Sequence, residues 1–231
     1  MPTIVTRGMA SARAFGFAAL GASNNWMLSI FNNSVVTEPF GSIELNSSNQ
    51  YVMLNRVNST YTDISVISSA GSILNSYRYS SSYPVAKLTR CFYDKTNNFF
   101  YFGARVGTYF AGVAKISSSY GGVTWVKDYD YTSRTSTSAS VDSIVVDSSQ
   151  NVYFGGNMYT STCCGDYGNG YILKLDSSGT VLNKAYFQQT ISTTVRQIVL
   201  NSSGAPTVIL GESGAHSSII SFDTSLVINW R

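Results

Sequence analysis

Val141-Asp142-Ser143-Ile144-Val145-Val146-Asp147-Ser148-Ser149-Gln150-Asn151-Val152-Tyr153-Phe154-Gly155-Gly156 opens the unit that decides the fold. After a polar loop the unit resumes with Gly170-Tyr171-Ile172-Leu173-Lys174-Leu175-Asp176-Ser177-Ser178-Gly179-Thr180-Val181-Leu182-Asn183-Lys184-Ala185-Tyr186-Phe187. Four runs rich in β-branched and aromatic residues, at 143–146, 152–155, 171–175 and 181–187, predict four short strands.

Tight polar turns join these runs, at 147–151 and 176–179. Asp and Asn side chains bond to backbone N–H groups two residues on, and Gly accepts positive φ, so both segments are typical of hairpins. A four-stranded antiparallel meander cannot bury both of its faces alone. The unit is therefore expected to stack on copies of itself.

Similar units cover residues 42–79, 88–129 and 195–230, and 26–31 and 227–231 both occupy the place of a fourth strand. The first-turn residues Asn46, Asp94, Asp147 and Asn201 recur about every 50 residues, as in propellers and arrays. We predict an all-β fold of about four four-stranded antiparallel units, β-propeller-like. A closed four-bladed ring, an open array completed by neighbouring subunits and two β-sandwich domains all fit this pattern.

The first 22 residues differ from the repeats because they are rich in Gly and Ala and contain no acidic residue. They fit a short secretory signal, an unstructured end, or an extended segment that orders against a partner through Arg7, Arg13, Phe15 and Phe17. We predict an N-terminal docking segment at 1–24 and a repeat domain at 25–231.

Composition excludes several classes of protein. Charged residues make up 12% of the chain and hydrophobic residues 44%, the reverse of the balance in disordered chains. The net charge of +3 comes without a run of Lys or Arg, which argues against nucleic-acid binding. No apolar stretch reaches the ~18 residues of a membrane span. A surface of hydroxyls and amides suits proteins outside the cell or inside a larger assembly.

No motif indicates catalysis, a cofactor or a metal ion. Asp94, Asp147, Asp176 and Asp223 stand where turns favour Asp, and the spacing of a calcium loop is absent. His216 is the single histidine and is expected in a loop. Three cysteines, of which Cys163 and Cys164 are adjacent, do not form a disulfide framework, and Cys91 is expected to pack as a small hydrophobe. We predict that the chain is not an enzyme.

The longest insertion, at 159–170, carries the strongest ligand signal. Tyr159 and Tyr167 give this loop the aromatic and amide character on which sugar rings stack, and Asp166 lies between them. Tyr109 and Phe110 fill the equivalent loop of the preceding unit. These five residues are the candidate ligand surface, although tyrosines in such loops also serve packing alone. Cys163 and Cys164 could be free thiols, a strained vicinal disulfide or a bridge to another subunit.

The segment from Asp147 to Gly156, continued at Tyr171-Ile172-Leu173-Lys174-Leu175-Asp176-Ser177-Ser178-Gly179, resembles β-propeller repeats with D-x-x-G-N-x-Y and K-L-D-x-x-G signatures. Gln150 replaces the usual Gly, and Asn46 and Asn201 replace Asp in other units. The opening Met1-Pro2-Thr3-Ile4-Val5-Thr6-Arg7-Gly8-Met9-Ala10-Ser11-Ala12-Arg13-Ala14-Phe15-Gly16-Phe17 resembles the start of tailed-phage structural proteins that carry such repeats.

The resemblance implies a virion component, a tail fibre or appendage, in an extracellular particle. Residues 1–24 would bind other virion proteins, and the β-domain would face a host-surface glycan or a neighbouring subunit of a homo-oligomer. Neither nucleic acid nor membrane is an expected partner. The alternatives are a capsid decoration protein and a secreted or periplasmic glycan-active enzyme on a propeller, which would need acidic residues gathered at one end of the ring.

Overall fold

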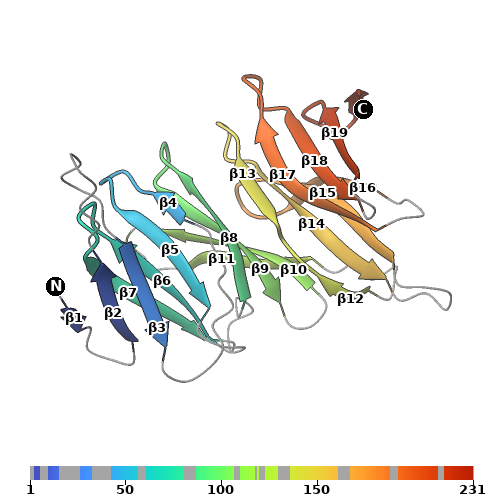
Figure 1. Cartoon of the computed structure of the whole chain (residues 1–231). Coiled ribbons are helices and arrows are strands. Elements are labelled where there is room, and N and C mark those ends of the chain that lie inside the picture. The colour runs from blue at the N-terminus through green and yellow to red at the C-terminus, as the bar shows by residue number, and fades with distance from the viewer. Residues whose placement is uncertain are drawn as a thin grey trace, which may run out of the picture.

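The structure is a computed structural model of the chain. It describes residues 3–5, 10–15, 27–32, 43–56, 61–80, 87–106, 110–117, 119, 123–129, 136–160, 167–187, 192–212 and 216–230. All the regular elements among these residues are β-strands, which pair antiparallel in five sheets (Figure 1). The described residues include no helix of the length and apolar character needed to cross a membrane.

The five sheets follow one another in chain order. The first sheet contains β1 (Thr3–Val5), β2 (Ala10–Phe15) and β3 (Met27–Asn32). The second contains β4 (Ile43–Leu45), β5 (Tyr51–Arg56), β6 (Tyr61–Ile67) and β7 (Ile73–Ser80). The third contains β8 (Lys87–Asp94), β9 (Phe99–Val106), β10 (Phe110–Ser117) and β11 (Val123–Tyr129).

The fourth sheet contains β12 (Ser136–Ala139), β13 (Ser143–Val146), β14 (Val152–Thr160), β15 (Tyr167–Leu175) and β16 (Val181–Phe187). The fifth contains β17 (Thr193–Leu200), β18 (Pro206–Glu212), β19 (His216–Phe222) and β20 (Ile228–Trp230). The second to fifth sheets each hold a four-stranded meander, so the predicted all-β, propeller-like fold is confirmed. His216 begins β19 instead of lying in a loop, because its backbone pairs with Glu212 of β18.

Five of the described turns that join strands of the meanders are of one kind. In the turn between β13 and β14, the Asp147 carboxylate accepts the N–H groups of Ser149 and Asn151, at 2.9 and 2.8 Å. The fourth turn residue has positive φ, for example Gln150 at 64° and Gly179 at 83°. Asn46, Asp176, Asn201 and Asp223 accept N–H groups in the same two-and-four pattern.

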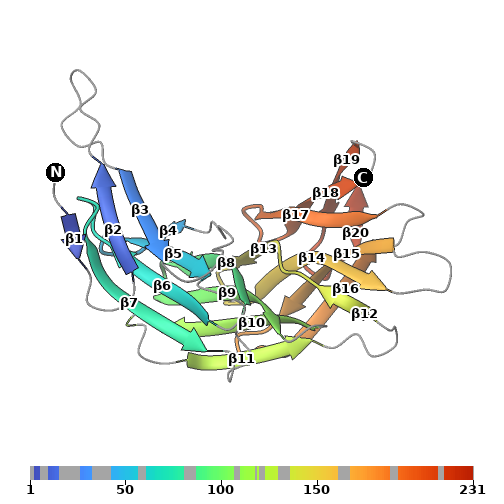
Figure 2. The same ribbon diagram turned by 60° about the horizontal axis from the view of Figure 1, so that its bottom comes forward.

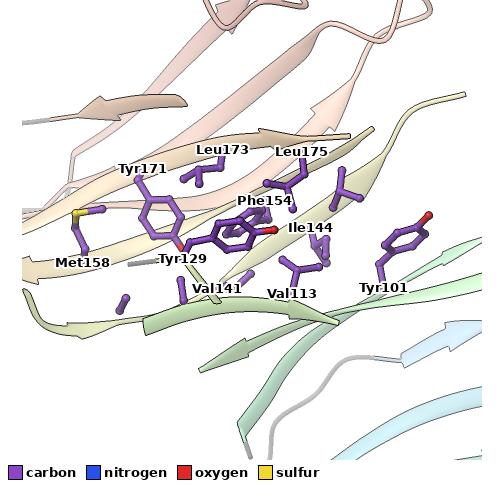
Figure 3. Packing of buried hydrophobic residues seen from close by; sticks show 13 residues of the cluster. Tyr101, Val113, Tyr129, Val141, Ile144, Phe154, Met158, Tyr171, Leu173 and Leu175 are labelled. Carbon is purple, nitrogen blue, oxygen red and sulfur yellow. The ribbon is translucent and has the colours of Figure 1, made fainter. Parts of the chain in front are cut away.

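The apolar cores lie between consecutive sheets, as stacking of incomplete units requires. One cluster joins the second and third sheets through residues such as Leu54, Ile64 and Cys91. The next joins the third and fourth sheets, where Figure 3 shows Tyr129 close to Phe154 and Tyr171. The last joins the fourth and fifth sheets and includes Ile172 and Phe222. Cys91 is buried in the first of these clusters, as predicted.

The sheets are arranged in an open arc. In Figures 1 and 2 the first and fifth sheets lie at opposite ends, and β4, β8, β13 and β17, the first strands of their meanders, lie toward the concave side. The strands of the first sheet pair with one another and with no described strand of the fifth. The described sheets therefore form an open array and not a closed four-bladed ring, and completion of the array by neighbouring subunits stays a prediction.

The N-terminal region differs from the sequence-based prediction in its pairing. Residues 26–31 were expected in the place of a fourth strand, but β3 is the third strand of its sheet: β1 pairs with β2, and β2 pairs with β3, with Ala12 opposite Ile30. The signal for β2 is weak because small residues alternate along it, and Ala and Ser contribute little to β-propensity. Part of the predicted docking segment at 1–24 therefore has partner strands within the chain.

Candidate functional site

Four of the twelve acidic side chains are engaged in turns. Asp94 accepts the N–H groups of Thr96 and Asn97, and Asp147, Asp176 and Asp223 each accept two backbone N–H groups. Hydrogen bonds to Asp176 from Ser178 and Thr180 lower its pKa, because they favour the ionised carboxylate. The prediction that turn formation explains these residues is confirmed.

Two lysines lie between sheets, each opposite a tyrosine on the neighbouring strand. Lys115 pairs with Tyr101, is nearly buried, and donates from Nζ to Gln150 Oε1 of the fourth sheet at 3.1 Å. Its Nζ also lies 4.2 Å from the centre of the Phe99 ring. Burial lowers the pKa of Lys115, and the nearby Asp94 charge partly offsets this change.

The second such pair is Lys174 and Tyr153 in the fourth sheet. Lys174 Nζ donates to the carbonyl of Thr224 in the fifth sheet at 2.9 Å, and burial raises the pKa of Tyr153 to about 12. The second sheet has Val52 opposite Val66 at the same place, and both are buried. An apolar pair replaces Lys and Tyr there, whereas Lys115 and Lys174 each join their sheet to the next one by a hydrogen bond.

The most concentrated polar site lies where the first strand of the fourth sheet is interrupted. β12 pairs with the far half of β14 and β13 with the near half, and residues 140–142 bulge between them. Gly156 of β14 faces this bulge, and a Cβ atom there would come within 2.1 Å of the Ser140 carbonyl oxygen. Gly156 is therefore required by the interruption, whereas a Cβ atom on Gly155 would meet the Tyr171 carbonyl oxygen at 2.4 Å.

We call Arg90, Ser140, Asp142 and Arg196 the inner rim. Arg90 and Arg196 come from β8 and β17, the first strands of the third and fifth sheets, and Ser140 and Asp142 come from the bulge of the fourth sheet. Arg90 Nε donates to the Asp142 carbonyl oxygen at 2.6 Å, and Ser140 Oγ donates to Asp142 Oδ2 at 3.1 Å. Burial raises the pKa of Asp142, while Ser140 and the charges of Arg90 and Arg196 act in the opposite direction.

A neighbouring amide fastens the fourth sheet to the fifth. Asn157 Nδ2 donates to the Thr193 carbonyl at 2.7 Å and to Thr194 Oγ1 at 3.1 Å. Asn157 Oδ1 is buried without a hydrogen-bond partner. Tyr171 donates its hydroxyl to the Ser140 carbonyl at 2.7 Å, which links this region to the inner rim. The Arg90–Asp142 and Asn157–Thr193 hydrogen bonds thus join the third, fourth and fifth sheets.

The described residues contain no group of three or more His, Cys, Asp or Glu side chains that could hold a metal ion. Asp142 and Asp147 flank β13 and so lie at opposite ends of that strand. The inner rim itself was not predicted from the sequence. Its one signal was the Gly155-Gly156 pair, which indicates a close backbone approach but does not identify the charged residues from other sheets.

The predicted ligand and docking residues are placed in part. Arg7, Phe17, Tyr109 and Asp166 lie outside the described residues, as do Cys163 and Cys164. Arg13 and Phe15 belong to β2, and Phe110 begins β10 opposite Val106. Tyr159 pairs with Gly168 and Tyr167 with Thr160. The structure thus brings Tyr159 and Tyr167 to adjacent rungs at one end of the β14–β15 hairpin, whereas Phe110 lies in the third sheet.

Comparison with known proteins identifies the fold and no family. No protein-family model matches the chain, and no curated protein matches it. Among solved structures, the chain is similar to one described as the Dos1 propeller, with a TM-score of 0.51 and 14% sequence identity over 80% of this chain and 46% of that one.

Apocarotenoid oxygenase of Synechocystis, as a Glu150Asp mutant, has a TM-score of 0.44 at 10% identity over 81% of this chain and 50% of that one. The chain spans about half the length of these structures. At this level of identity the likeness concerns the fold alone: the chain has a propeller-like fold.

Proposed function

We propose that this chain is a non-enzymatic structural protein of a bacteriophage particle, a tail fibre or appendage. Its N-terminal segment binds other virion proteins, and its β-domain faces a host surface or a neighbouring subunit. The observation that carries the proposal is the use of the turn carboxylates. Asp147, Asp176 and Asp223 organise a repeat scaffold instead of gathering at one site.

Three further features support this proposal. The repeat and N-terminal motifs resemble those of tailed-phage structural proteins. The low charge content suits a surface that is packed into a larger assembly. Apolar side chains are exposed on the fifth sheet, where a partner would be expected to cover them.

The attachment is tested by charge reversal. Arg7→Glu with Arg13→Glu should reduce the amount of chain that co-sediments with purified particles by more than about tenfold, because a few charged anchors dominate such contacts. The matched control is Lys95→Glu with Lys184→Glu, which reverses two exposed lysines in the repeat domain. Mass spectrometry of the particles measures the copy number. Absence of the wild-type chain from particles would overturn the proposal, and equal incorporation of both variants would disprove the docking role of these arginines.

The glycan-facing role has its own test. Tyr159→Ala with Tyr167→Ala should weaken binding of the purified chain to host cells, since stacking of a sugar ring on the face of a tyrosine ring supplies much of the contact. Tyr186→Ala is the control, because Tyr186 is an exposed tyrosine on β16 of the same sheet. Unchanged cell binding by the double variant would remove these residues from the ligand surface.

A further inference from the structure

The fifth sheet has one face on which apolar side chains are exposed. Antiparallel register places Val199, Thr207, Ser221 and Trp230 on one rung and Ile209 and Ile219 on another rung of the same face. Val199, Ile219 and Trp230 are about half exposed, and Ile209 is 37% exposed. We call Val199, Ile209, Ile219 and Trp230 the outer face of the fifth sheet.

In the second sheet the face equivalent to the outer face is covered by another sheet. Leu54 pairs with Ile64 in the second sheet as Ile209 pairs with Ile219 in the fifth. Both Ile64 and Ile219 lie three residues before the end of the third strand of their meander. Leu54 and Ile64 are 2% and 0% exposed, because the third sheet covers them. The same rung is therefore buried by a following sheet in one meander and open in the other.

The fourth sheet repeats this comparison. Ile172 lies on the corresponding rung of β15 and is fully buried against the fifth sheet. Neighbouring Gly155 gives the fifth sheet a close approach, since a Cβ atom there would meet the Val195 side chain at 3.0 Å. In the fifth sheet Ile209 occupies the position of Gly155, and in the second sheet Leu54 occupies it. At this position the outer face of the fifth sheet therefore resembles the second sheet more than the fourth.

We propose that a second copy of this chain covers the outer face of the fifth sheet with its first sheet, and that two such contacts close a ring of two chains. The open arc leaves the first and fifth sheets at opposite ends of the array (Figures 1 and 2). If a two-fold axis relates the two copies, the first sheet of each copy contacts the fifth sheet of the other. The two contacts then close the ring, and no end sheet stays uncovered. The aligned part of this chain, 80% of its length, covers 46% of the Dos1 propeller chain, so two aligned parts together match most of that propeller in length.

The two surfaces are also matched in charge. The outer-face rungs carry no charged residue, and one set of alternate rungs in the first sheet pairs Ala12 with Ile30 and Ala14 with Leu28. The Arg196 side chain lies over Gly211 at the margin of the outer face, where a Cβ atom added to Gly211 would be 2.8 Å from Arg196 Nε. Sheets with uncharged rungs pack on each other without burying an unpaired charge.

The ring deepens the subunit-contact part of the proposed function, but it is tested on the purified chain without particles. Light scattering after size exclusion should give twice the mass of one chain. Ile209→Asp with Ile219→Asp should weaken the dimer more than about 100-fold, because two buried apolar contacts are each replaced by a charge. Leu74→Asp with Leu182→Asp is the matched control, since both leucines are about half exposed on the fourth strands of other sheets, and this variant should remain dimeric.

Circular dichroism checks the fold of each variant, and Trp230→Ala replaces the double variant if the latter does not fold. Hydrogen exchange at low and high protein concentration then locates the contact. Concentration-dependent protection in both β1–β3 and β18–β20 supports the ring. Protection in the fifth sheet alone indicates back-to-back pairing and overturns the ring. A monomeric wild-type chain, or a dimer that the Ile209 and Ile219 changes leave intact, overturns the proposal, and neither result affects particle attachment.

Discussion

Asp147 shows how a single side chain sets the geometry of a hairpin. Its Oδ1 accepts two backbone N–H groups, and its Oδ2 accepts the Asn151 side-chain amide at 2.8 Å. Backbone hydrogen bonds between Asp147 and Asn151 and between Gln150 and Asp147 complete the turn. The positive φ of Gln150 is held by this network, in a position where a glycine would need no such support.

Replacing this carboxylate should therefore destabilise the fold. Asp147→Ala leaves two backbone N–H groups without their acceptor and should lower the free energy of unfolding by about 1–2 kcal/mol. Asp128→Ala, on the exposed side of β11, should change it by less than about 0.5 kcal/mol. Urea denaturation followed by tryptophan fluorescence compares the two. Equal effects of both substitutions would contradict the structural role of the turn carboxylate.

Asp142 and Asp176 should give opposite dependence of stability on pH. Burial raises the pKa of Asp142 above its ordinary value of 3.8, so its stabilising contribution is full below that value and is lost as the pH rises through the folded-state pKa. Hydrogen bonds lower the pKa of Asp176, so its contribution is present above 3.8 and is lost as the pH falls through the folded-state pKa.

The matched variants are Asp142→Asn and Asp176→Asn, which remove the same charge. Relative to wild type, Asp142→Asn should gain stability as the pH rises above 3.8. Asp176→Asn should be less stable than wild type at neutral pH, and this difference should shrink as the pH falls below 3.8. Urea denaturation at a series of pH values measures both curves, and slopes of the same sign would refute the assignment.

At the scale of the element, β11 and the turn between β15 and β16 form one of the contacts between sheets. Trp125 Nε1 donates to the Ser177 carbonyl at 3.0 Å, and the Tyr129 hydroxyl donates to the Gly179 carbonyl at 2.8 Å. A Cβ atom on Gly179 would lie 2.8 Å from Lys127 Cγ and 3.3 Å from the Trp125 ring. This turn is therefore shaped by the neighbouring sheet as well as by its own strands.

Two glycine substitutions separate backbone strain from this contact. Gly179 and Gly204 have similar positive φ values of 83° and 77°, but a Cβ atom on Gly204 would meet no atom closer than 3.6 Å. Gly204→Ala should cost about 1 kcal/mol for the left-handed backbone alone. Gly179→Ala should cost about 1–2 kcal/mol more, since Lys127 and Trp125 must move. Thermal unfolding of both variants measures the difference between their losses of stability. Equal losses would show that the side chains of β11 move aside at no cost in free energy.

Turns and strands differed in how well the sequence predicted them. Turns at 147–151 and 176–179 were predicted correctly because Asp, Asn and Gly act locally on the backbone. β14 ends at Thr160 and β15 begins at Tyr167, so both strands extend well into the predicted loop. Cross-strand pairing continues there through polar residues such as Asn157 and Asn169. β12 was missed for the same reason, since Ser136–Ala139 lacks an alternating apolar pattern.

The inner rim could not be predicted because its members meet through sheet stacking. Arg90 and Asp142 are 52 residues apart in the chain, and no local pattern relates them. The exposure of Ile209 and Ile219 could not be predicted either, since a strand pattern gives no information on whether the second face of the sheet is covered. Whether the array closes on itself is likewise decided by the angle between sheets.

The whole molecule is a linear series of cores, each shared by two consecutive sheets. The third and fourth sheets have cores on both faces, whereas the fifth has one described core. In arrays of this kind stability depends on nearest-neighbour contacts, so a sheet at the end of the array opens more readily.

Hydrogen exchange of the native chain should reflect this order. Amides of β9, β14 and β15 should exchange slowest, and amides of β18 and β19 should exchange faster in the monomer than in the dimer. Mass spectrometry of peptic fragments gives the rates for each strand. Uniform exchange along the chain would show that the sheets unfold together and would contradict the nearest-neighbour description.

Because each core belongs to a pair of adjacent sheets, a gene segment that encodes one meander can be duplicated or deleted while the other cores stay intact. The Leu54–Ile64 and Ile209–Ile219 rungs place apolar side chains at the same position of two meanders. Evolution can therefore change the number of blades in such proteins by recombination, with adaptation needed at a single junction.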